Sequence, residues 1–294
     1  MFPILSFEER KARTLRALSL SSTAEFPVVM GVLNTTPDSF SDGGQFQSQD
    51  AIRAQCEFFS DNGTAIIDIG GESTRPGSDP VTVTEEWSRV KDAIGIAKRH
   101  TSNLVSIDTQ KPEIARRALE EGADIVNDVS GLRDPDMASL VGRAQCPTVV
   151  MHMRATPKTM QEGNIVYGDL CSEIESSLQN SIQAALSAGL PLDKLIVDPG
   201  IGFGKTLEHN LTLTRELHRF HKLGTPILYG PSRKRFLGTL TGKEAADRDM
   251  ATAAVIALGI EFGADIVRVH NPEVCRDAVQ VAGAVAAIRG SLPS

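Results

Sequence analysis

The sequence predicts a single (β/α)8 barrel, and three observations support this fold class. Short apolar runs alternate with longer helical patterns about eight times, which is the repeat of such a barrel. The apolar runs are nearly continuous, as in parallel strands that are buried on both faces. No linker rich in Pro, Gly or Ser divides the 294 residues, so one domain is expected. A doubly wound open sheet is the alternative, because it gives the same alternation.

The elements can be assigned in order along the chain. Strands are expected at residues 28–34, 65–71, 104–109, 125–130, 148–153, 195–198, 226–230 and 266–270. Helices are expected at residues 49–61, 85–99, 112–121, 170–188, 207–221, 248–262 and 272–288. Several helical patterns are followed by a glycine suited to a left-handed helix end, namely Gly63, Gly122, Gly189 and Gly263. Residues 1–26 form an N-terminal extension without an assigned role, and residues 27–294 form the barrel.

Composition and charge exclude several classes of protein. The formal net charge is −7 and no run of Lys or Arg stands out, which argues against a nucleic acid or an anionic membrane as partner. No apolar run approaches the ~20 residues of a membrane helix. Charged residues interrupt the first 26 residues, so no signal peptide is expected. The four cysteines lie far apart, without metal or redox spacing, and a cytoplasmic protein is expected.

Polar residues stand at the ends of the predicted strands. They are Asn34, Glu72, Asp108, Asn127, Asp128, His152, Asp198, Ser232, Arg268 and His270. One such residue can simply cap a helix or bond to a loop. Because the carboxyl ends of all barrel strands open on one face, the whole set predicts an active site there. The long loops at residues 35–48 and 72–84 are expected to close over a ligand, with a disordered surface loop as the alternative.

Other chemistries are disfavoured. The run GKT at residues 204–206 resembles the end of a phosphate-binding P-loop, but Pro199 stands where the leading Gly is required. The stretch is better interpreted as a tight turn that puts Asp198 on the pocket floor and Phe203 on its wall. His152 has no second metal ligand nearby, and no serine lies in a G-x-S-x-G elbow. A metal site at His152 and a nucleophilic hydrolase are therefore not expected.

Seven motifs follow one another along the chain. Two are long: GVLNTTPDSFSDGG at residues 31–44 and DIGGESTRPG at residues 68–77. The others are SIDT at 106–109, NDVSG at 127–131, DPGIGFGK at 198–205, SRK at 232–234 and RVH at 268–270. Together they resemble the motifs of the bacterial dihydropteroate synthases. The resemblance covers roughly residues 28–285 and implies the barrel that the strand pattern also predicts.

The resemblance implies a transferase of folate synthesis. The family joins 6-hydroxymethyl-7,8-dihydropterin diphosphate to p-aminobenzoate and releases pyrophosphate, with Mg²⁺ as cofactor, and it is the target of sulfonamide drugs. The reaction breaks a C–O bond beside an electron-rich pterin, so the protein must chiefly position both substrates and stabilise the leaving anion. Family members are commonly homodimers, and a homodimer is expected here; the late helices of this sequence are apolar, which also suits packing on the barrel.

The same resemblance implies the site residues. The pterin is expected to contact Asp108, Asn127, Val129, Met151, Asp198 and Lys234. The diphosphate is expected to contact Asn34, Arg75, Arg268 and His270, with Asn34 also a ligand of Mg²⁺. p-Aminobenzoate is expected to contact Phe40, Thr74, Pro76, Phe203, Ser232 and Arg235, with its carboxylate facing the helix after the SRK motif. The catalytic set is Asp108, Lys234, Asn34, Arg268 and His270, and no general base is assigned.

Departures from the family pattern leave alternatives open. Arg235 stands where many relatives have Ser, Arg154-Ala155 replaces Gln-Gly, and Asn271 replaces Asp. A methyltetrahydrofolate methyltransferase-like barrel would share the pterin contacts but would not need the diphosphate residues. A catalytically silent pterin-binding relative would have lost a ligand contact, and none is missing. A sulfonamide-insensitive enzyme would be altered at residues 40–44, which match the family here.

Overall fold

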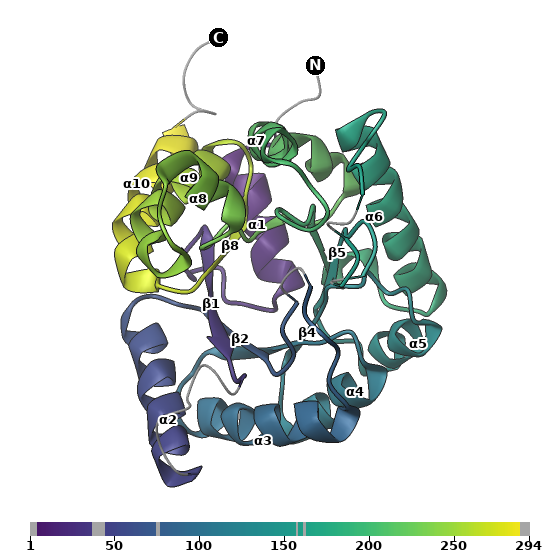
Figure 1. Ribbon diagram of the computed structural model, residues 1–294, viewed down its shortest axis with the longest axis vertical. Helices are drawn as coiled ribbons and strands as arrows, with labels where there is room; N and C mark the ends of the chain where they lie inside the picture. Colours follow the sequence, from purple (N-terminus) through teal and green to yellow (C-terminus); the bar gives the residue numbers. More distant parts are fainter. Residues whose placement is uncertain (1–4, 37–44, 75–76, 157, 161–162, 289–294) are drawn as a thin grey trace.

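Eight parallel strands close into a barrel, as the sequence predicts (Figure 1). The computed structural model describes residues 5–36, 45–74, 77–156, 158–160 and 163–288. The strands are β1 (Val28–Asn34), β2 (Ile66–Gly70), β3 (Leu104–Asp108), β4 (Ile125–Asp128), β5 (Thr148–Met151), β6 (Leu195–Asp198), β7 (Leu228–Tyr229) and β8 (Ile266–Val269). Their order is β6-β5-β4-β3-β2-β1-β8-β7, and a bridge between Val197 and Ile227 closes the ring. The open-sheet alternative is therefore wrong.

Helices surround the strands (Figure 1). They are α1 (Phe7–Ala17), α2 (Gln45–Asp61), α3 (Val83–His100), α4 (Pro112–Glu121), α5 (Pro135–Ala144), α6 (Leu170–Ser187), α7 (Leu207–Arg215), α8 (Arg235–Thr241), α9 (Asp249–Glu261) and α10 (Pro272–Ile288). The predicted helix at 207–221 was wrong at its end, because 3-10 turns follow α7 over Leu217–Leu223. Buried apolar side chains at Leu217, Phe220 and Leu223 explain this, since a spacing of three places them on one face of a 3-10 helix.

Side chains alternate between the two faces of each strand, and the inward faces fill the barrel in layers. The lower inward layer is apolar and contains Met30, Ile66, Ile125, Val149, Ile196, Leu228 and Ile266. Two residues further on, four of these strands carry a polar inward side chain: Asp68, Asn127, Asp198 and Arg268. The alternation therefore places a polar layer above an apolar one, toward the carboxyl ends of the strands.

Helix α1 packs against the barrel core, although no role was predicted for residues 1–26. It begins at a capping box in which Ser6 and Glu9 cap each other's backbone. Leu15 and Leu18 are buried against the apolar layer inside the barrel, and each burial stabilises the fold by roughly 1.5–3 kcal/mol. Arg10 is also buried, and its Nε lies 2.8 Å from Asp265 Oδ1, just before β8. Helix α1 thus closes the amino-terminal end of the barrel and leaves the other end for the site.

Candidate active site

A charged cluster occupies the polar layer inside the barrel. Arg268 on β8 donates from Nε to Asp68 Oδ2 and from Nη2 to Asp108 Oδ2, both at 2.7 Å. Asn127 on β4 donates from Nδ2 to the same Asp68 oxygen at 3.1 Å. Two carboxylates therefore share one guanidinium, and the Oδ1 atoms of Asp68 and Asp108 have no hydrogen-bond partner in the described part of the chain. Such unpaired buried acceptors are costly unless a ligand completes them.

Asp108 is the titratable group of this cluster. Burial raises its pKa to about 7; the Arg268 guanidinium lowers the pKa, while the Asp68 charge raises it. Asp108 therefore changes charge near neutral pH, in a position where a substrate can meet it.

The turn after β6 builds the floor of the site. Asp198 accepts a hydrogen bond from the Gly200 backbone N–H at 2.7 Å, and burial raises the Asp198 pKa while the Lys234 charge opposes this. Gly200 has φ +72°, and a Cβ there would lie 1.9 Å from the His152 carbonyl oxygen, so only glycine fits the turn. Phe203, predicted as a wall, lies with its ring centroid 4.4 Å from Lys234 Nζ. Burial lowers the Lys234 pKa to about 8.

Lys205 supports this turn from below. Its buried Nζ lies 3.0 Å from His152 Nδ1 and donates to the Phe203 carbonyl oxygen at 3.0 Å. Burial lowers the pKa of His152 to about 2 and also holds the pKa of Lys205 well below its ordinary value. Lys205 is thus tied into the turn, which agrees with rejecting a P-loop here.

An apolar wall stands beside the cluster. Val129 and Met151, both predicted for the pterin pocket, are buried in one cluster with Met153 and Met160. Phe203 packs against the same cluster and is partly exposed. A flat ring could therefore lie against this wall while its polar edge reaches Asn127 and Asp198.

The segments that follow β7 and β8 are joined by hydrogen bonds and by one ion pair. Ser232 Oγ lies 2.9 Å from His270 Nδ1 and also accepts from the His270 backbone N–H at 3.1 Å. Arg233 has φ +58°, a strained value for a residue with a side chain, and Asp249 holds it in a bidentate ion pair. Asn271 donates to Asp249 at 3.1 Å and accepts from Val274 N–H at the start of α10. The unusual Asn271 therefore serves this turn.

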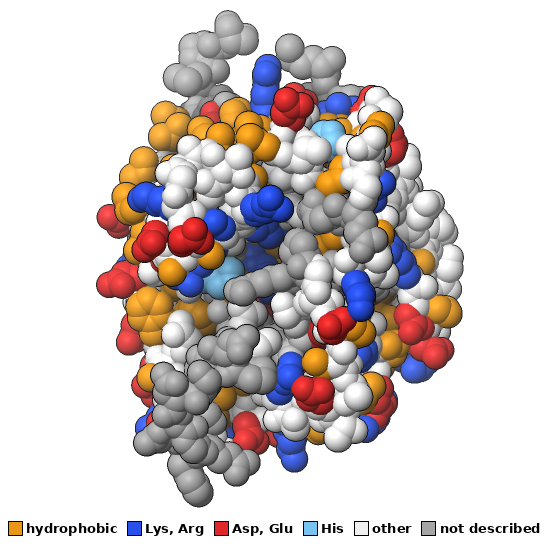
Figure 2. Space-filling view, in the orientation of Figure 1, with side chains coloured by type: hydrophobic (Ala, Val, Ile, Leu, Met, Phe, Trp, Pro, Cys, Tyr) orange, Lys and Arg blue, Asp and Glu red, His pale blue; other side chains and the backbone are white. Residues whose placement is uncertain are grey.

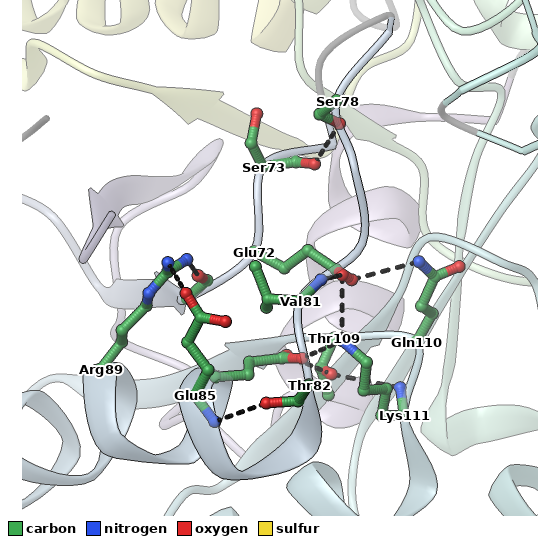
Figure 3. Close-up of polar contacts among 12 residues, drawn as sticks. Glu72, Ser73, Ser78, Val81, Thr82, Glu85, Arg89, Thr109, Gln110 and Lys111 are labelled. Atoms are coloured by element: carbon green, nitrogen blue, oxygen red, sulfur yellow. Dashed lines mark hydrogen bonds and ion pairs between the residues drawn. The ribbon is translucent and has the colours of Figure 1, made fainter. Parts of the chain in front are cut away.

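The loop after β2 is tied at its base to the neighbouring elements (Figure 3). Glu72 accepts from the Val81 backbone N–H at 2.8 Å, which brings the two ends of the loop together. Lys111 Nζ bridges the Glu72 carboxylate at 3.0 Å and the fully buried Glu86 carboxylate at 2.5 Å. Thr109 donates to the other Glu86 oxygen at 2.6 Å. These contacts therefore fix the base of this loop.

The structure describes some of the remaining predicted site residues and not others. Asn34 ends β1 in register with Gly70, where a Cβ would lie 3.5 Å from Asp108 Cβ, so Asn34 borders the cluster. Thr74 is partly buried, and Arg235 is exposed at the first residue of α8. Phe40, Arg75 and Pro76 lie outside the described residues. Figure 2 shows basic side chains and a histidine gathered at a hollow near the middle of the visible face.

Sequence reasoning missed Asp68 as part of the site. The prediction was based on polar residues at strand ends, whereas Asp68 lies in the middle of β2. The available signal was the period of two from Ile66, which points Asp68 into the barrel beside apolar neighbours.

Comparison with known proteins supports one family. The family described as "Pterin binding enzyme" matches residues 30–270. The dihydropteroate synthase of Synechocystis sp. is 43% identical over 260 residues, which cover 87% of this chain and 89% of that protein. The dihydropteroate synthase of Xanthomonas albilineans, solved with 4-aminobenzoic acid, has a TM-score of 0.83 at 39% identity, covering 92% and 95% of the two chains. That of Yersinia pestis, solved with a sulfonamide drug complex, has a TM-score of 0.83 at 35% identity and covers 88% and 94%.

Proposed function

The chain belongs to the pterin-binding enzymes and is a dihydropteroate synthase, and from this premise we propose how its residues divide the reaction. The enzyme condenses 6-hydroxymethyl-7,8-dihydropterin diphosphate with p-aminobenzoate to give 7,8-dihydropteroate and pyrophosphate. The observation that carries the proposal is the Asp68–Arg268–Asp108 cluster beside Asn127, because one cation and several acceptors face the same end of the barrel.

The pterin lies in the pocket of Asn127, Asp198 and Lys234. Asp198 accepts from the amino and ring N–H groups of the aminopyrimidinone, and Lys234 donates to its carbonyl oxygen and a ring nitrogen. Asn127 contributes its Oδ1 atom, since its Nδ2 is used by Asp68. Val129 and Met151 cover one side of the ring.

The diphosphate lies beside Arg268 and His270, with Asn34 and Arg75 as further contacts. Arg268 is partly exposed, so its guanidinium can reach an anion without leaving the barrel. Ser232 Oγ accepts the His270 backbone N–H and lies 2.9 Å from His270 Nδ1, so it orients the ring. His270 Nε2 is the ring atom proposed to donate to a diphosphate oxygen.

Mg²⁺ is proposed as an ion that enters with the diphosphate. Among the residues that the structure describes, no three His, Cys, Asp or Glu side chains are grouped to hold a metal. An amide oxygen such as Asn34 Oδ1 suits a magnesium ion whose other ligands are phosphate oxygens and water. When bound, the ion neutralises charge on the leaving diphosphate.

p-Aminobenzoate is placed at the rim, against Phe203 and Thr74, with Phe40 and Pro76 as further contacts. Arg235 is exposed at the first turn of α8 and offers a cation for its carboxylate. Ser232, also predicted for this substrate, is instead proposed to orient His270. Because sulfonamides mimic p-aminobenzoate, the same rim is the site at which this enzyme is a sulfonamide target.

Chemistry follows from this placement. The aniline nitrogen attacks the methylene carbon, a C–N bond forms, the C–O bond to the diphosphate breaks, and the nitrogen then releases a proton to solvent. The Asp108 carboxylate stabilises positive charge that develops on the pterin, and Arg268 stabilises the leaving anion. No side chain is assigned as a general base.

The test is pyrophosphate release by purified protein with both substrates and Mg²⁺. Asp198→Ala and Lys234→Ala should remain folded and lose most of the activity, because each removes a pterin contact. Folded wild-type protein that releases no pyrophosphate would refute the synthase function. Binding of a pterin without turnover would then favour the methyltransferase-like or silent alternatives.

The proposal extends to a homodimer in the cytoplasm. Exposed apolar side chains gather over α9 and α10 (Figures 1 and 2), and they include Met250, Leu258, Val281, Val285 and Ile288. A second copy covering this patch would remove it from water. The four cysteines are free and buried, which suits a reducing compartment. No described helix is long and apolar enough to cross a membrane.

A further inference from the structure

Asp68 contacts two ligand-binding side chains but is assigned no substrate contact. Its side chain is fully buried in β2, and its Oδ2 atom receives Arg268 at 2.7 Å and Asn127 at 3.1 Å. We propose that Asp68 is a positioning residue that sets the orientation of both Asn127 and Arg268 before pterin diphosphate binds. This inference rests on the proposed function, since the two side chains matter only as ligand contacts.

The effect on Asn127 follows from the chemistry of the two groups. An asparagine side chain can present either its oxygen or its NH₂ group to a ligand, depending on how the amide is turned. An ionised carboxylate only accepts hydrogen bonds, so Asp68 binds the NH₂ group and rejects the oxygen. Asn127 is therefore held with Oδ1 free to accept from an N–H of the pterin. A neutral partner at position 68 would lose this selection.

Asp68 also restricts the conformation of the Arg268 side chain. A free arginine side chain has many rotamers, and binding an anion would require one of them to be selected. Asp68 engages Nε and Nη2, and Asp108 engages Nη2 as well. The third nitrogen, Nη1, makes no hydrogen bond to the residues that the structure describes, so its N–H groups are available to the diphosphate.

A merely structural role does not explain the cluster. Two buried carboxylates share one guanidinium, and one oxygen of each has no partner among the described residues. A buried cluster with two carboxylates and one guanidinium lowers the stability of the fold relative to apolar packing. Natural proteins keep such destabilising groups where function requires them.

The first test is Asp68→Asn, which keeps the shape and removes the charge. Calorimetry should show pterin diphosphate binding weakened about 10- to 100-fold, as for loss of hydrogen bonds to a charged group, with the KM for p-aminobenzoate unchanged. Ser106→Ala is the matched control, because Ser106 pairs with Asp68 in register, is equally buried, and its Oγ bonds none of the described residues. A folded D68N protein with wild-type affinity for pterin diphosphate overturns the inference.

A swapped pair separates the two roles. In Asp68→Asn with Asn127→Asp, an amide again faces a carboxylate, and an oxygen again faces the pterin. The affinity for 6-hydroxymethyl-7,8-dihydropterin, which has no diphosphate, should recover relative to D68N alone. The additional affinity that the diphosphate group provides should not recover. No recovery of pterin binding would contradict the Asn127 role.

The unmodified protein offers a test that does not depend on folding of a variant. The Arg268 Nε–H should give an ordered nitrogen relaxation signal without ligand, unlike Arg215, whose side chain is 80% exposed. A mobile Arg268 in the ligand-free enzyme overturns the inference. Failure of pyrophosphate release by the wild type would instead refute the underlying function, so the two failures can be told apart.

Discussion

Each end of the barrel pairs an arginine with aspartate, but Arg10 is buried and Arg268 is partly exposed, and the carboxylate oxygens around them are paired to different extents. At the amino-terminal end Arg10 meets one carboxylate, and both Asp265 oxygens are used, by Arg10 and by the Ile227 backbone N–H. At the carboxyl-terminal end Arg268 is shared by Asp68 and Asp108, and each leaves one oxygen unpaired among the described residues. The Asp265 carboxylate is therefore fully paired within the folded protein, whereas the Asp108 carboxylate keeps an oxygen that we expect a bound substrate to face.

The largest effect should come from Asp108→Ala. Loss of the carboxylate beside the pterin should lower kcat about 10²- to 10³-fold, as for the loss of one electrostatic contact to a developing charge. The melting temperature should stay the same or rise, because one of two crowded carboxylates is gone. Steady-state kinetics and thermal unfolding check this, and a large fall in melting temperature would contradict the comparison.

Arg10→Met should show the opposite pattern. It leaves Asp265 buried without its cation and should lower the free energy of unfolding by roughly 3–5 kcal/mol. The kcat of the folded protein should not change, because Arg10 lies at the other end of the barrel. Adding Asp265→Asn should recover part of the loss, since the amide oxygen can still accept from Ile227. Chemical denaturation measures both variants, and equal stability of R10M and wild type would disprove the assignment.

The pH dependence of activity should come from groups at the carboxyl-terminal end of the barrel. The pKa of Asp108 is raised to about 7, so activity should fall as this carboxylate gains a proton at lower pH. The pKa of Lys234 is lowered to about 8, so activity should also fall above that pH as the ammonium loses its proton. The profile of kcat/KM for pterin diphosphate should therefore be bell-shaped. In Lys234→Arg the upper limb should move to higher pH, and an unchanged limb would exclude Lys234 as its origin.

The smallest effect should come from Glu72→Gln at the base of the loop after β2. The amide keeps an acceptor for the Val81 backbone N–H but loses the ion pair with Lys111. The KM for p-aminobenzoate should rise about 3- to 10-fold, as for one lost charge-assisted hydrogen bond, with little change in kcat. Glu120→Gln is the control, because its ion pair with Arg116 is exposed on α4. A similar rise in E120Q would show that loop anchoring is not the cause.

The barrel could be predicted because its signals are local. Buried parallel strands give continuous apolar runs, and Gly63, Gly122, Gly189 and Gly263 all have the positive φ expected of them. Strand-end residues such as Asp198 and Arg268 follow directly from where a barrel keeps its chemistry. These features need only a short stretch of sequence.

The rest depends on partners far apart in the chain. Lys111 bridges Glu72 and Glu86, and no local pattern shows that these two carboxylates meet. Arginine is usually found at the surface, and Arg10 stands in a segment rich in charged residues. Only the closed barrel places it beside Asp265. Asp68 could be predicted only in part. The alternation of side chains along β2 indicates that Asp68 points into the barrel, but it does not indicate which residues Asp68 contacts.

The docking of α1 has a consequence for how the chain is made. Arg10 and Asp265 are 255 residues apart, so α1 leaves the ribosome long before its partner beside β8 has been synthesised. Until then Leu15 and Leu18 have no closed barrel to enter, and the apolar interior of the growing sheet remains open. Contacts so distant in sequence are slow to form and leave partly folded chains prone to aggregation. The barrel core is therefore completed only after β8 has been synthesised, by a helix that was made long before it.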